Sequence, residues 1–158
     1  MSGFLASLRN DYRLQMARHR NRPFLKAVMA ACSLAAVADG EVSFSERMRL
    51  DQILQTLEEL KVFDPHEAVN LFNDYSAAIL ASPKGGREKA LKAVQAVTQD
   101  PDTAELLIRI CLAVAEAKGE KGLIDQIEIV MLCTILGVEP KFAGLYTDGS
   151  SDALIRDA

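Results

Sequence analysis

The sequence has no tryptophan, two histidines and three cysteines among its 158 residues. Neither His19 nor His66 lies near a cysteine, and there is no CxxC pair, so a zinc site is not expected. Cys32, Cys111 and Cys133 each lie inside an apolar helical run, and we expect all three to be buried core residues in a reducing compartment. The chain also has no nucleophile elbow, phosphate-binding loop or HExxH motif. So few candidate general bases favour a binding protein over an enzyme.

Long apolar runs are also missing, since none reaches the ~18 consecutive residues of a membrane span. Residues 27–38 follow Lys26 and end in Ala-Val-Ala, which imitates a signal peptide with its cleavage site. Against that interpretation, the preceding region is long and contains Asp11, and a similar segment recurs around Cys111. We therefore predict a core helix here, in a cytoplasmic protein.

The charge is unevenly distributed along the chain. Residues 1–26 contain six basic residues and one acidic residue, whereas the rest contains 12 basic and 21 acidic residues, for a total of −4. The acidic body argues against nucleic acid as a partner, because a phosphate backbone would meet mostly carboxylates. The basic arm indicates an anionic surface.

That arm, residues 1–22, has apolar side chains near helical spacing: Phe4, Leu5, Leu8, Tyr12 and Met16. One interpretation is a helix that packs on the body and turns a solvated basic face outward. The other is a helix that lies on an anionic membrane surface. Arg22-Pro23 predicts a break after the arm, because proline disfavours a helix interior.

Apolar residues recur at helical spacing throughout the chain, which predicts an all-α fold of about seven helices. The arm would form the first helix and residues 141–158 a turn-rich tail, on either side of one helical domain at 23–140. Residues 82–86 (Ser-Pro-Lys-Gly-Gly) predict a flexible connector near mid-chain. Caps, prolines and glycines predict helices within the domain at 24–38, 43–60, 65–80, 87–98, 101–117 and 123–136.

The domain contains a weak internal repeat. A shift of 79 residues places Cys32 on Cys111 and Gly40 on Gly119, together with the small residues around them. We therefore expect two pseudo-symmetric helix–loop–helix halves. The apolar helices at 24–38 and 101–117 would pack against each other at the centre of the core.

Each half places carboxylates at its loop. Asp39, Glu41 and Glu46 follow the first apolar helix in a pattern like the second part of an EF-hand loop, but Ala35 and Val37 stand at ligand positions. The loop is therefore not an EF-hand. If the halves pack about a pseudo-two-fold axis, both loops together would supply five carboxylates: Asp39, Glu41, Glu46, Glu120 and Asp125. Oxygen ligands alone suit Ca²⁺, Mg²⁺ or Mn²⁺ better than zinc.

The alternative is that these acids cap helices. Gly40 can take the positive φ that ends a helix, and Ser43 with Glu46 fits a helix-starting capping box. On the residues alone, capping ranks ahead of metal binding.

Ala38-Asp39-Gly40 with Glu46, repeated in weaker form before a helix ending Ile-Leu-Gly-Val at 135–138, resembles the TerB-like tellurite-resistance family over about 24–140. The resemblance implies an all-helical bacterial domain of tellurite and general stress resistance that binds a divalent metal through loop acids. The matched positions are Asp39, Glu46 and Asp125, whereas Lys118 stands where the pattern has a second aspartate. The resemblance raises metal binding above capping.

The family also implies membrane-bound protein partners and a place at the inner membrane face. The resulting hypothesis is a non-enzymatic, metal-binding stress-resistance protein. A metal-free helical scaffold or interaction module is the alternative, and an enzyme of unknown type is the third possibility.

Overall fold

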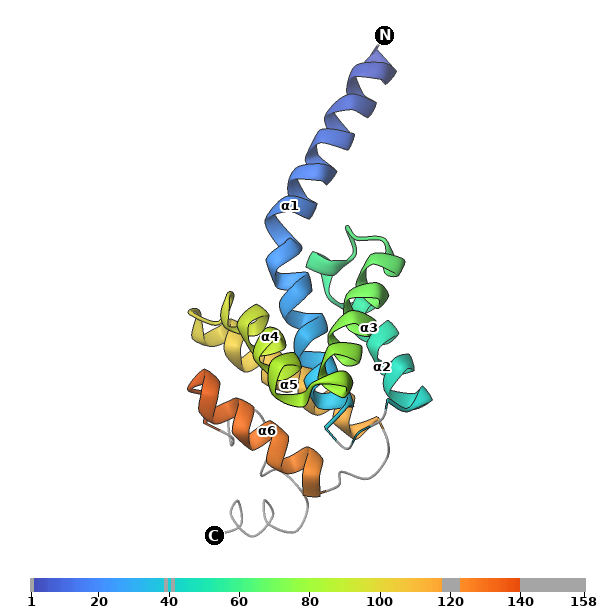
Figure 1. Ribbon diagram of the computed structural model, residues 1–158. Coiled ribbons are helices and arrows are strands. Elements are labelled where there is room, and N and C mark those ends of the chain that lie inside the picture. The colour runs from blue at the N-terminus through green and yellow to red at the C-terminus, as the bar shows by residue number, and fades with distance from the viewer. Residues whose placement is uncertain (1, 39, 41, 118–122, 140–158) are drawn as a thin grey trace, which may run out of the picture.

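The computed structural model describes residues 2–38, 40, 42–117 and 123–139, with the backbone alone at 2 and 123–125. In these ranges the chain is all-α, as predicted, with no strand, and none of its helices is both long and apolar enough to cross a bilayer (Figure 1). The elements are α1 (Ser2–Ala36), α2 (Phe44–Thr56), the 3₁₀ turn η1 (Glu58–Leu60), α3 (Pro65–Ala81), α4 (Pro83–Gln95), α5 (Pro101–Glu116) and α6 (Leu123–Leu136).

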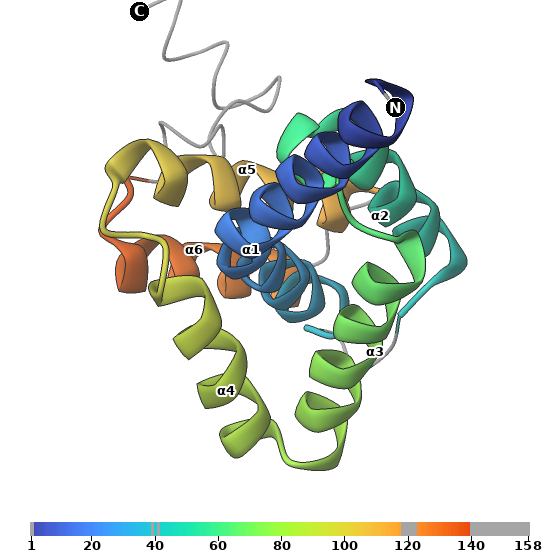
Figure 2. The same ribbon diagram turned by 90° about the horizontal axis from the view of Figure 1, so that it is seen from above.

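The second half of α1 forms the centre of the fold. From Leu25 to Val37 every residue except Lys26 is buried, and α3, α4 and α5 pack around this segment (Figure 2). Cys111 of α5 approaches so closely that its Sγ lies 3.3 Å from the carbonyl oxygen of Ala31, to which it donates. The predicted central helix pair is therefore confirmed, and residues 27–37 belong to the core. The pseudo-symmetry of the two halves stays a prediction.

The predicted break at Pro23 is wrong, because α1 continues through this residue. Proline removes one backbone hydrogen bond and crowds the preceding turn, which normally kinks or ends a helix. Here the preceding turn is anchored from outside the helix. Arg18 and Asn21 donate to backbone carbonyls between α2 and α3, and Arg22 pairs with Glu67 of α3. These contacts anchor the turn before Pro23, and α1 bends between the arm and the body without being interrupted (Figure 1).

The predicted flexible connector at 82–86 is also wrong. α4 begins at Pro83, so both glycines lie inside its first turns. A Cβ on Gly86 would lie 2.4 Å from the carbonyl oxygen of Ala78 and from the backbone nitrogen of Ile79. The glycine is therefore needed for close approach of α4 to the end of α3, not for flexibility.

Local start and stop signals predicted most helix ends correctly. Asp64 and Asp100 cap α3 and α5, each followed by proline, and accept from the backbone N–H two residues later at 2.9 and 3.1 Å. α6 ends at Leu136, and the next residue, Gly137, has a φ of +71°, the left-handed conformation that glycine tolerates. The helix predicted to reach Leu60 instead ends at Thr56 and continues as η1.

Overpacking tests the central helix pair. Ala36 of α1 and Ala115 of α5 are both fully buried. We expect either Ala36→Leu or Ala115→Leu to lower the free energy of unfolding by roughly 1–3 kcal/mol, because the added carbons have no space to enter. Ala113→Leu on the same α5 is the control, since Ala113 is partly exposed. An unchanged denaturation midpoint for Ala115→Leu would contradict the close packing of α1 and α5.

Candidate functional site

Glu46 is the member of the predicted ligand set whose side chain the structure describes. It lies in the first turn of α2, where its Oε1 accepts from the backbone N–H of Ser43 at 2.8 Å. The Oγ of Ser43 accepts from the backbone N–H of Glu46 at 3.1 Å. The predicted capping box is thus confirmed. Glu46 is only 1% exposed, which is unusual for a capping acid because a buried carboxylate loses most of its hydration.

The other four predicted ligands lie outside the described residues. This holds for Asp39, Glu41 and Glu120, and for the side chain of Asp125, whose backbone lies in α6. Within the described part of the chain, no three His, Cys, Asp or Glu side chains gather into a group that could hold a metal ion. Gly40, between the first two of these acids, has the predicted positive φ, +95°, but α1 already ends at Ala36.

The segments that flank both loops meet in space. Arg49, one turn after Glu46, donates from Nη1 to the carbonyl oxygen of Ala113 at 3.0 Å. Ala113 lies in the last turn of α5, immediately before the second loop. The start of α2 and the end of α5 are therefore fixed side by side, as two loops that contribute to one site would require.

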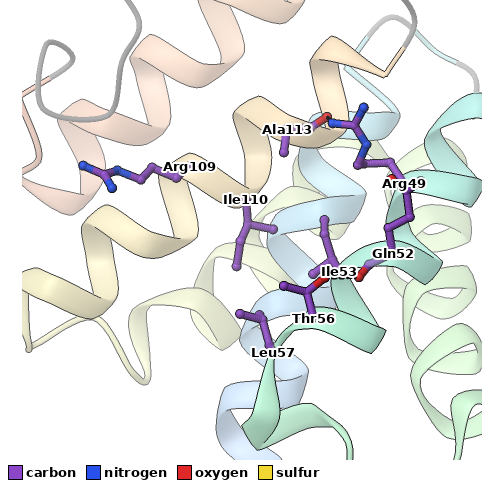
Figure 3. A pocket seen from close by; sticks show the side chains of 8 residues that line it. All are labelled: Arg49, Gln52, Ile53, Thr56, Leu57, Arg109, Ile110 and Ala113. Atoms are coloured by element: carbon purple, nitrogen blue, oxygen red, sulfur yellow. Dashed lines mark hydrogen bonds between the residues drawn. The ribbon is translucent and has the colours of Figure 1, made fainter.

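The same two helices border an open groove of about 350 Å³, which the sequence did not predict (Figure 3). Its lining combines apolar side chains with two arginines at separate positions: Arg49, Gln52, Ile53, Thr56, Leu57, Arg109, Ile110 and Ala113. Arg109 also pairs with Glu105 one turn earlier at 2.6 Å. The lining therefore offers apolar contacts together with two guanidinium groups.

The three cysteines are free and buried, as predicted. Burial raises the pKa of the Cys32 thiol to about 12 and that of Cys133 to about 11, and raises the pKa of Cys111 well above its ordinary value. The uncharged thiol is therefore the stable form at each position, whereas a nucleophile or metal ligand needs the thiolate. The three cysteines therefore act as small buried side chains of the hydrophobic core.

The sequence profile described as "Tellurite resistance protein TerB" matches residues 25–143. A curated relative from Alcaligenes sp., named "Tellurium resistance protein TerB", is 31% identical over 110 residues, which cover 70% of this chain and 90% of the relative. No solved structure shows a significant match. The profile match begins where α1 enters the core, so it excludes the basic arm. These two matches show that the chain belongs to the TerB family.

Proposed function

We propose that this chain is a non-enzymatic protein of tellurite and general stress resistance that binds a divalent cation through its loop carboxylates. Family membership supports the resistance role. The observation on which the metal proposal depends is the burial of the Glu46 carboxylate at the start of α2. A buried carboxylate needs compensation by hydrogen bonds, opposite charge or a cation, and a cation can also gather the other loop acids.

In this proposal the ligands come from both loops: Asp39, Glu41, Glu46, Glu120 and Asp125. The contact of Arg49 with Ala113 supports it, because it holds the flanks of the two loops together. The ion would be Ca²⁺, Mg²⁺ or Mn²⁺, since the ligand set is all oxygen. The capping role of Glu46 is compatible with it: Oε1 serves the cap, and a carboxylate has further lone pairs for an ion.

We further propose that the protein works in the cytoplasm at the inner face of the membrane, with membrane-bound protein partners. The alternative is a metal-free helical scaffold or interaction module. The groove between α2 and α5 favours that alternative, because it offers an open apolar surface without a ligand set (Figure 3).

Thermal melts of the wild type and Glu46→Gln, in chelator and with each ion, test the metal proposal. Glutamine keeps the capping box and removes the buried charge, so in chelator the variant should melt at or above the wild-type temperature. Ion at a hundred times its Kd should stabilise the wild type by about 2.7 kcal/mol, or roughly 5–10 °C for a chain of this length. The glutamine variant should gain little, because a neutral amide is a poor ligand for a hard cation.

Glu88→Gln is the matched control, because it removes one negative charge from an exposed position on α4. Its melting temperature should rise with added ion as much as that of the wild type. A wild type that melts at one temperature in chelator and in every ion would leave Glu46 as a cap and favour the metal-free scaffold. If the ion raised the melting temperatures of the wild type and Glu46→Gln equally, the ion would bind at other residues. Glu120 and Asp125 would then be the next residues to test.

A further inference from the structure

The first half of α1 projects from the body as an arm (Figure 1). From residue 3 to residue 16 every side chain is exposed except that of Ala6, which is half-buried. At the helical rise these residues extend about 21 Å beyond the anchored turn at 18–22. Nothing else in the described part of the chain covers this helix. Its stability therefore depends on contacts with another molecule.

One side of the arm is apolar. Leu5, Leu8 and Tyr12 follow each other at helical spacing, with Phe4 and Met16 beside them, and these five side chains are between 45% and 68% exposed. A helix of this length is marginal in water without packing of its apolar face. A continuous apolar stripe on a free helix is therefore typical of a surface that binds a partner or a lipid interface.

The charges beside the stripe indicate what that partner is. Arg9, Arg13 and Arg20 are exposed, and Asp11 is the one acid within residues 1–26. Two such arms side by side would bring arginines together, which disfavours a second copy of the arm. A basic helix with an apolar stripe instead matches an anionic lipid surface, which supplies negative charge and an apolar interior.

The stripe continues toward a cationic cleft at the base of the arm. Leu5, Tyr12, His19 and Lys26 are spaced seven residues apart, about two helical turns, so they lie on the same side of α1. A cleft of about 330 Å³ opens there between α1 and α4, lined by His19, Arg22, Pro23, Lys26, Ala93 and Ala96. Its ionisable side chains are all basic. Arg22 is already paired with Glu67 at 2.9 Å, so the exposed Lys26 supplies the charge for an anionic headgroup.

We propose that the arm docks this protein directly onto an anionic lipid membrane, with the apolar stripe in the interface and a lipid phosphate in the cleft. The proposal deepens the membrane part of the proposed function, but it needs neither the metal nor a protein partner. The family match begins at residue 25, so the arm is a feature of this chain beyond the matched domain.

Vesicle sedimentation in chelator tests the membrane-docking proposal with lipid as the only binding partner and without metal ions. The probes are phosphatidylcholine vesicles with and without phosphatidylserine, and the full chain should bind the anionic vesicles at least about tenfold more tightly. Arg9→Gln/Arg13→Gln should weaken that binding by about fivefold per arginine. Leu8→Gln/Tyr12→Gln should weaken binding to both vesicles.

Ser7→Gln/Asn10→Gln changes the opposite side of the arm and should bind as the wild type does. All three variants alter exposed side chains, so their melting temperatures should match. Equal binding to neutral and anionic vesicles, or wild-type binding by both stripe and arginine variants, would overturn the proposal. So would a chain that ignores vesicles but dimerises through Leu8 and Tyr12. Because chelator is present throughout, failure here leaves the metal proposal intact.

Discussion

Replacing Gly86 by alanine should lower the free energy of unfolding by roughly 2–4 kcal/mol. The new Cβ would lie 2.4 Å from backbone atoms of Ala78 and Ile79. A backbone atom cannot rotate away as a side chain can, so α4 must shift from α3. The gain in helix propensity on replacing glycine, at most about 1 kcal/mol, is too small to offset this loss of packing. Urea denaturation of the variant and the wild type measures the difference.

Gly85→Ala is the matched control, one residue earlier in the same helix. Its Cβ would lie 3.4 Å from the Oγ of Ser82, which is ordinary contact, so we expect unchanged or slightly raised stability from the helix propensity. If both variants were equally stable, the close crossing of α3 and α4 at Gly86 would be wrong.

The sequence predicted those features that depend on a few neighbouring residues. Asp64 and Asp100, each before a proline, mark their helix starts because a cap needs only one acceptor and two or three backbone N–H groups. The box of Ser43 and Glu46 is equally local. Burial of the helix after Leu25 was also predictable, because it is apolar on every side.

Features that depend on distant residues were missed. Pro23 and the glycines at 85 and 86 are helix-breaking signals in any local window. α1 nevertheless continues through Pro23, because the turn before it is anchored to the segment after α2. α4 includes both glycines, because Gly86 leaves the space in which α3 lies close to α4. Neither contact can be read from neighbouring residues.

At the candidate site, too, local features were predicted from the sequence and features that depend on distant residues were not. The sequence placed Glu46 at a helix start, but its near-complete burial follows from the packing around it. The groove between α2 and α5 was not predicted because it arises where two helices from different halves cross. The apolar stripe of the arm was visible in the sequence, whereas the choice between packing on the body and projecting into solvent needed the course of α1.

Replacing Arg87 by methionine should cost about 3 kcal/mol of stability, the low end of the range for breaking a buried ion pair. Arg87 of α4 binds Glu128 of α6, and the side chains are 26% and 9% exposed. Methionine keeps most of the volume but leaves the Glu128 carboxylate without its guanidinium. The cost is at the low end because Arg87 is partly open to water, which can enter to hydrate the carboxylate.

The double variant Arg87→Met/Glu128→Leu should recover most of that loss, because it removes the buried charge together with its partner. Lys61→Met is the control at an exposed ion pair with Glu58, where a change within about 1 kcal/mol is expected. Chemical denaturation of the wild type, Arg87→Met, Glu128→Leu and the double variant gives the coupling energy between Arg87 and Glu128. A loss for Arg87→Met no larger than for Lys61→Met would show that this pair is solvated like a surface pair and does not hold α6 against α4.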